Sequence, residues 1–257
     1  MNVIVLGFLG SLAAGLMTAV GALPILVGRT VSRRANDILL GFAAGIMLSA
    51  SYFSLIIPGL DIAGAQYGEG VIPGLIAVGG ILLGAGAIYL LNERVPHRHF
   101  VSGLEGPKAA SVRKIWLFVI AITLHNIPEG LAVGVGFGGG DMGAATTLAL
   151  GIGLQNAPEG LAVALALRSE GYKSGFAFLV AAATGLVEPV AGLLGVLAIS
   201  ASEILLPWGL TFAAGAMLYV ISNEIIPETH RHGHHKGATA GLMAGVVVMM
   251  FMDVVFG

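Results

Sequence analysis

The chain contains no cysteine, and only 10% of its 257 residues are Asp, Glu, Lys or Arg. The missing cysteine excludes a disulfide-linked scaffold, thiolate metal sites and cysteine nucleophiles. A soluble domain carries roughly a quarter charged residues, so this chain has too little charge for a water-exposed surface. A basic nucleic-acid-binding face is also excluded, since 12 Lys and Arg stand against 14 Asp and Glu. What is present, 56% hydrophobic residues with 40 glycines, is typical of closely packed transmembrane helices.

Eight apolar stretches are long enough to cross a bilayer, whose hydrocarbon core needs about 20 helical residues. The sequence therefore predicts an all-α integral membrane protein with eight transmembrane helices in a single domain over residues 1–257. The expected spans are Val3–Val27, Ile38–Leu60, Val71–Leu91, Ile115–Val135, Ala144–Leu167, Gly175–Ile199, Leu206–Ile226 and Ala238–Phe256.

The positions of Lys and Arg predict the orientation in the membrane. All twelve fall in the segments after the first, third, fifth and seventh spans, and the segments after the second, fourth and sixth contain none. Under the positive-inside rule the side that carries these residues is cytoplasmic, so both termini face outward. An arrangement with seven or nine spans would divide the basic residues between the two sides.

Parts of the first half recur in the second half. Phe-Ala-Ala-Gly at 42–45 returns at 212–215, an offset of 170, and Ile-Ile-Pro at 56–58 returns at 225–227, one residue out of register. The matching spans cross the membrane in opposite directions, and such an inverted repeat is typical of transporters. We expect repeat one over 1–91, two central helices over 115–167 and repeat two over 175–257. Chance similarity between Ala- and Gly-rich helices is the alternative.

Two spans carry related polar motifs within apolar sequence. The fourth contains His-Asn-Ile-Pro-Glu-Gly at 125–130, and the fifth contains Gln-Asn-Ala-Pro-Glu-Gly at 155–160. Residues four positions apart share a helix face, so each motif presents a Glu beside His125 or Gln155. Both motifs begin about ten residues into their spans, roughly 15 Å along the axis, and therefore reach the bilayer midplane. Glu188 of the sixth span lies near the same depth.

Each motif also places a proline inside a helix. Pro128 and Pro158 have no N–H, so the carbonyls of Leu124 and Leu154 lose their usual donors. Freed carbonyls at this depth are tolerated where neighbouring groups or a cavity satisfy them. A simple packing kink is the alternative interpretation.

The acidic residues of these spans have no basic counterpart. Glu129, Glu159 and Glu188 would together cost on the order of 8–10 kcal/mol if charged and unpaired in the membrane, and no Lys or Arg lies in any predicted span. The compensating charge must come from protons, a metal ion or a cationic substrate; a network of permanently protonated glutamates is the alternative. Imidazole with carboxylates favours Zn²⁺, Fe²⁺, Mn²⁺ or Cd²⁺ over Mg²⁺ or Ca²⁺.

With these paired motifs the chain resembles the ZIP family of divalent metal transporters, in its bacterial branch, over essentially its whole length. The resemblance implies a 3+2+3 arrangement of helices, a plasma (cell inner) membrane location and metal bound between the second, fourth, fifth and sixth spans. Some members have Asp where Asn156 stands and hold two metals side by side, so a second tightly bound metal is in question here. The implied metal-site residues are Met47, His125, Asn126, Glu129, Gln155, Asn156, Glu159 and Glu188.

Further polar residues lie at the predicted ends of the spans. Some resemble acidic positions at the outer mouth, for which ordinary interfacial carboxylates are the alternative. Others lie on the cytoplasmic side, near the exit or in two His-rich tracts, which either bind metal or are solvated loops that bind it weakly. These accessory candidates are Asp61 and Asp253 outside, and Glu224, His97, His99, His230 and His232 inside; relatives have a His where Asn223 precedes Glu224.

The sequence thus predicts a transporter that carries divalent metal, zinc above all, into the cytoplasm by alternating exposure of the midplane site. Zn²⁺ or another divalent ion is the substrate; we expect no organic cofactor and no nucleic-acid partner. The resemblance and GxxxG spacings such as Gly41–Gly45 favour a homodimer. An intramembrane metal-dependent hydrolase is one alternative, but its His-Glu-x-x-His motif is absent from the sequence. A metal-selective channel with the same ligands is the other.

Overall fold

The computed structural model describes residues 2–28, 31–94, 108–231 and 233–256, which form helices joined by short turns, and no strand occurs among them. In chain order the elements are α1 (Val3–Ala22), η1 (Leu23–Ile25), α2 (Arg33–Ala50), η2 (Ser51–Ile56), α3 (Ile57–Tyr67), α4 (Val71–Arg94), α5 (Lys108–Gly138), α6 (Met142–Ser169), α7 (Ser174–Gly185), α8 (Val187–Ala201), η3 (Glu203–Leu205), α9 (Leu206–Val220), η4 (Ile221–Ile225), α10 (Ile226–His230) and α11 (His235–Phe256). Of the short elements, η1 and η3 are 3-10 turns, whereas η2 and η4 are π-helical.

Within these described ranges, eight helical spans are long and apolar enough to cross a membrane, which confirms the predicted all-α membrane protein. Most boundaries differ from the prediction by a few residues, and two differ more. The second span continues past Leu60 to Tyr67, and α5 begins at Lys108 instead of Ile115. Apolar sequence marks only the part of a helix that lies in the hydrocarbon core, whereas the helical hydrogen bonds continue beyond it.

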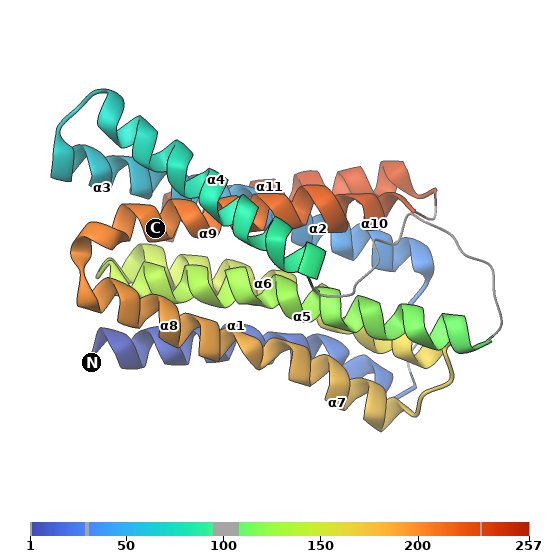
Figure 1. The fold of residues 1–257 in the computed structure, drawn as a ribbon. Coiled ribbons are helices and arrows are strands. Elements are labelled where there is room, and N and C mark those ends of the chain that lie inside the picture. Colours follow the sequence, from blue (N-terminus) through green and yellow to red (C-terminus); the bar gives the residue numbers. More distant parts are fainter. Residues whose placement is uncertain (1, 29–30, 95–107, 232, 257) are drawn as a thin grey trace.

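The two motif-bearing helices, α5 and α6, lie in the middle of the bundle (Figure 1). On one side of them α1 packs along α6 and α8 packs along α5; on the other side α2 packs with α11 and α4 with α9. The spans of α5 and α6 have the largest buried share and that of α11 the smallest. The polar motifs therefore lie in the most protected helices, and both termini lie at the same end of the bundle (Figure 1).

Glycines let these helices approach backbone to backbone. A Cβ on Gly41 of α2 would collide with a carbonyl oxygen of α11, and one on Gly241 of α11 would collide with a carbonyl of α2. Gly84 meets α9 and Gly134 meets α8 in the same way. The GxxxG spacings thus pack helices within one chain. They no longer support a homodimer, a prediction that now rests on the family resemblance alone.

Several contacts occur in matched pairs at the offset of 170 found in the sequence. Gly15 of α1 and Gly185 of α7 face each other, and a side chain on either would strike the carbonyl oxygen of the other. The π-helical turns η2 and η4 also match; η2 has six residues and η4 has five. That single-residue difference accounts for the register shift between the two Ile-Ile-Pro segments. The division into two inverted repeats stays a prediction.

Candidate metal centre

Seven polar residues singled out in the sequence lie on three neighbouring helices, α5, α6 and the first turn of α8. Each is at most 2% exposed. The motif spacing explains part of this arrangement, since the first and fifth residues of each motif share one helix face. These residues are His125, Asn126, Glu129, Gln155, Asn156, Glu159 and Glu188.

The two motif asparagines bind neighbouring helices through matched hydrogen bonds. Nδ2 of Asn126 donates to the carbonyl oxygen of Thr184 on α7, and Nδ2 of Asn156 donates to that of Ala14 on α1, both at 2.9 Å. The acceptors are related by the offset of 170. Asn156 also donates to Oε1 of Glu188 at 2.7 Å. The asparagines therefore hold the helices around the site, and Asn156 in addition holds one carboxylate.

Most other polar atoms of this cluster lack partners. Among the described residues, no group forms a hydrogen bond with either carboxylate oxygen of Glu129 or Glu159, or with Oε2 of Glu188. Nor does any Lys or Arg in the described part of the chain pair with these three glutamates. Burying an unpaired carboxylate is costly. The charge deficit predicted from the sequence is therefore present in the structure, and a cation or protons must supply the compensating charge.

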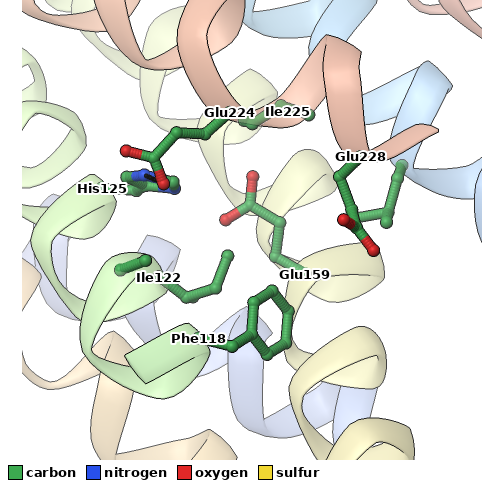
Figure 2. Close-up of a pocket in the computed structure, with 9 residues that line it drawn as sticks. Phe118, Ile122, His125, Glu159, Glu224, Ile225 and Glu228 are labelled. Atoms are coloured by element: carbon green, nitrogen blue, oxygen red, sulfur yellow. Dashed lines mark ion pairs between the residues drawn. The ribbon is translucent and has the colours of Figure 1, made fainter. Parts of the chain in front are cut away.

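A pocket of about 400 Å³, its open mouth included, leads from the cluster to one end of the bundle. Figure 2 shows the carboxylates of Glu159 and Glu224 pointing into the same space, with the His125 ring against Glu224. The lining includes residues near the starts of α2 and α5 and near the end of the seventh span, so the mouth faces the end that carries the Lys and Arg residues. The other lining residues are Leu40, Phe118, Ala121, Ile122, Ile225 and Glu228.

His125 is held at the inner side of the cluster by Glu224. Nε2 of His125 lies 2.9 Å from Oε2 of Glu224, although the two groups are not aligned for a hydrogen bond. Glu224 belongs to η4, where the wider π-helical turn carries it. A His binds metal through an unprotonated nitrogen, so Glu224 either competes with a metal ion for His125 or shares the ion with it.

The cluster does not form a closed metal cage. Across residues 2–28, 31–94, 108–231 and 233–256, no three His, Asp or Glu side chains gather closely enough to hold a metal ion. His125 is turned toward Glu224 and Glu188 toward Asn156, while Glu129 lies within electrostatic reach of both Glu159 and Glu188. The donors line one continuous polar region and must converge for a metal ion to be coordinated.

Met47 is fully buried in the apolar cluster that includes Ala50, Leu55 and Ile152. Its role as a metal ligand stays a prediction. Of the carboxylates predicted to lie at the outer mouth, Asp61 is exposed on α3, and Asp253 of α11 accepts a hydrogen bond from the Ser54 hydroxyl at 2.7 Å.

Of the predicted cytoplasmic histidines, His230 ends α10, and its ring centre lies 5.2 Å from that of His235. His97, His99 and His232 lie outside the described residues.

Two acidic residues were not selected from the sequence although the structure places them at or near the pocket. Glu228 lines the mouth, and its signal was the spacing of four residues from Glu224, which puts both on one helix face. Asp37 is buried near the start of α2, three residues before Leu40, which lines the pocket. Nothing in the sequence distinguishes Asp37 from an ordinary interfacial carboxylate.

Within the described ranges, eight helical spans fit to cross a membrane, together with a buried acidic cluster and a pocket to one end, are the features of a cation transport protein. A family model described as ZIP zinc transporter matches residues 92–253. The zinc transporter GufA of Myxococcus xanthus is 47% identical over 251 residues, covering 98% of this chain and 99% of its own. Zinc transporter ZIPB of Bordetella bronchiseptica is 50% identical over 249 residues (97% and 81%), and human zinc transporter ZIP11 is 37% identical over 322 residues (94% and 94%). The chain belongs to the ZIP zinc transporter family, as its paired motifs predicted, and is a divalent metal transporter.

Proposed function

We propose that this chain carries zinc into the cytoplasm through the buried cluster on α5, α6 and α8. The observation that carries the proposal is the set of three buried glutamates without Lys or Arg partners in the described residues, in a region that a pocket connects to one end of the bundle. Zinc fits the available imidazole, carboxylate and amide donors, and the relatives above are named zinc transporters. Those names also point away from the hydrolase alternative.

The orientation of the pocket in the membrane follows from the charge distribution. The end with the Lys and Arg residues is cytoplasmic under the positive-inside rule, and the pocket opens at this end. The structure then represents the inward-facing state, from which an ion leaves past Glu224 and Glu228. On the opposite side, Ser54, Asp61 and Asp253 are the residues that an incoming ion meets first.

The roles of the site residues follow from their chemistry. Glu129, Glu159 and Glu188 supply the negative charge, while His125 supplies a nitrogen once Glu224 releases it. The amide oxygens of Asn126, Gln155 and Asn156 act as neutral ligands, and Met47 adds a sulfur if α2 moves relative to α6. Movement of the inverted repeats (1–91 and 175–257) around the central helices (115–167) alternates access to the site. The plasma membrane location and the homodimer belong to the same proposal.

Flux into proteoliposomes that contain the purified protein tests this function. We expect saturable zinc uptake, with Cd²⁺ as a competitor and Mg²⁺ without effect, because the donors include imidazole nitrogen. Flux that rises linearly with concentration and does not saturate would favour the channel alternative. Equal flux of Mg²⁺ and Zn²⁺ would contradict the proposed selectivity.

A further inference from the structure

Three aromatic side chains form a cluster at the end of the bundle where α5 and α7 begin (Figure 1). Trp116 of α5 donates a hydrogen bond from Nε1 to the hydroxyl of Tyr172, in the connection between α6 and α7, at 2.9 Å. The ring of Phe176, in the first turn of α7, is stacked on that of Tyr172, with the ring centres 5.3 Å apart. Phe176 is 41% exposed. The cluster therefore joins α5 to the α6–α7 connection and keeps one aromatic ring at the surface.

The cluster lies at the depth where the apolar spans begin. Trp116 precedes the span Phe118–Gly138 by two residues, and Phe176 is the third residue of the span Ser174–Ala201. Leu179, about one turn further along α7, is exposed and continues the apolar surface into the membrane. Trp and Tyr are enriched at this depth because their rings are largely apolar but carry a polar group. The cluster therefore faces the headgroup region of the bilayer.

The sequence next to the aromatic cluster is mainly basic. Residues 113–116 and 168–176 contain four Lys or Arg and one acidic residue, Glu170. The guanidinium of Arg168 donates to the carbonyl oxygen of Tyr172, which holds one positive charge beside the rings. Basic residues next to a span attract anionic lipid headgroups. The four basic residues are Arg113 and Lys114 of α5, Arg168 of α6 and the exposed Lys173 at the N-cap of α7.

The cluster lies on a different face of α5 from the pocket. Residues two positions apart on a helix do not share a face. Phe118 lines the pocket, whereas Trp116 contacts Tyr172 of the α6–α7 connection. A molecule bound at the cluster thus lies behind a helix that forms part of the pocket wall, and outside the pocket itself.

We propose that this aromatic–basic surface, formed by Trp116, Tyr172, Phe176, Arg168 and Lys173, binds an anionic phospholipid. The basic side chains attract the headgroup, and the acyl chains pack along the exposed apolar face of α7. A zwitterionic lipid such as phosphatidylcholine has no net charge to complement these residues and binds more weakly. The lipid holds the starts of α5 and α7 together. Lipid binding here involves no metal, so its failure leaves the proposed zinc transport unaffected.

Tryptophan fluorescence tests this inference, because the chain has two tryptophans and they lie at opposite ends of the bundle. In the Trp208→Phe variant, Trp116 is the only tryptophan left. Its quenching is measured in vesicles of phosphatidylglycerol and phosphatidylcholine, with one lipid at a time brominated near the headgroup end of its acyl chains. We expect phosphatidylglycerol to bind beside Trp116 at least about fivefold more strongly, the gain expected from one Lys or Arg at an anionic surface.

The other tryptophan provides the matched control. In the Trp116→Phe variant, Trp208 in the first turn of α9 reports on an end of the bundle where the preceding segment, residues 175–207, has no Lys or Arg. The two brominated lipids should therefore quench Trp208 equally. A preference for phosphatidylglycerol of the same size at both tryptophans would contradict a specific surface at Trp116.

Charge variants in the Trp208→Phe background identify the residues responsible. Arg168→Gln with Lys173→Gln should remove the preference for phosphatidylglycerol, whereas Arg168→Lys, which keeps the charge, should retain it. Lys236→Gln removes an exposed positive charge from the first turn of α11 and should change nothing. If the double variant does not fold, Lys173→Gln alone, which changes an exposed side chain, should lower the preference.

Equal quenching of Trp116 by the two brominated lipids would overturn the proposal, because the surface would then bind lipid without regard to charge. A preference that survives the loss of both Arg168 and Lys173 would overturn it as well. Soluble glycerol phosphate should not displace the brominated lipid, since it has no acyl chains to pack on α7. Displacement by glycerol phosphate would show a phosphate site instead of a lipid site.

Discussion

At the scale of single residues, the site is built from buried groups that serve two different purposes. Asn126 and Asn156 donate to backbone carbonyls of α7 and α1, so they hold helices together as well as offering amide oxygens to an ion. Glu129 and Glu159 have no hydrogen-bond partner in the described chain. Position 188 carries a Glu, whereas Thr18, its match at the offset of 170, is uncharged. Of this matched pair, only the residue on α8 is acidic.

Replacing Glu159 with alanine should abolish zinc uptake without loss of folding. Its carboxylate points into the pocket and makes no hydrogen bond to a described residue, so its removal takes away a ligand and an uncompensated buried charge. We expect uptake in proteoliposomes to fall by more than about tenfold, which corresponds to ~1.4 kcal/mol of ion binding. Glu170→Ala, at the exposed end of the same helix, is the control. Wild-type flux from correctly inserted Glu159→Ala protein would refute the assigned role.

Replacing Asn156 with aspartate should make the stability of the protein depend more strongly on zinc. Aspartate loses the hydrogen bonds to the carbonyl of Ala14 and to Glu188, and it puts a second carboxylate beside that of Glu188. Two adjacent buried carboxylates repel each other unless a cation lies between them. We expect a lower melting temperature without zinc and a larger zinc-induced increase than in wild type, measured by thermal unfolding in detergent.

The variant Asn156→Ala separates the two effects of that change. It removes the same hydrogen bonds without adding a carboxylate, so the melting temperature should fall while the zinc-induced increase does not grow. An equal response to zinc in the aspartate and alanine variants would mean that position 156 does not coordinate metal.

At the scale of helices, two features position the site: close glycine contacts and π-helical turns. α2 against α11 and α4 against α9 pack through glycines that leave room for a facing carbonyl. The turns η2 and η4 carry Ser54 and Glu224, which match each other at the offset of 170. Ser54 bonds Asp253 and Glu224 contacts His125. The turn η2 thus places a polar side chain toward one end of the bundle, and η4 places one toward the other end. π-helical turns are frequent at functional sites.

Gly84→Val should destabilise the protein whereas Gly86→Val should not, although both positions lie in α4. A side chain at position 84 would collide with the carbonyl of Phe212 on α9, whereas nothing lies within 4 Å of a Cβ at position 86. Overpacking costs about 1–3 kcal/mol, so Gly84→Val should reduce the yield of monodisperse protein in size-exclusion chromatography. Gly86→Val should resemble wild type. Equal yields for both variants would show that the α4–α9 contact is not as close as described.

At the scale of the whole molecule, some spans carry buried polar residues and others expose apolar surface. The central α5 and α6 carry buried polar motifs, whereas α4 and α11 expose long apolar faces suited to lipid. All Lys and Arg lie outside the eight predicted apolar stretches, in the segments that the eight-span arrangement places on one side. This distribution predicts the orientation independently of the site.

Labelling of introduced cysteines tests that orientation directly, since the chain has no cysteine of its own. Glu69 and Glu170 are exposed in connections at opposite ends of the bundle. In intact cells, a membrane-impermeant maleimide should label Glu69→Cys, and it should label Glu170→Cys only after permeabilisation. The reverse pattern would place the pocket mouth on the outer side and contradict inward release.

The sequence alone determined the eight spans, the buried acidic cluster and its lack of basic partners, because hydrophobicity and charge are properties of each segment and need no knowledge of its neighbours. Family membership likewise followed from two local motifs. The family resemblance also implied that α5, α6 and α8 meet at one site.

Only the tertiary structure showed that Asn126 bonds Thr184, that His125 faces Glu224, and that Asp37 lies beside His234. The last two contacts join residues 99 and 197 positions apart, whose approach depends on how the helices pack. The GxxxG spacings were ambiguous for the same reason: a small-residue stripe indicates close packing, but its partner helix is set by the fold as a whole.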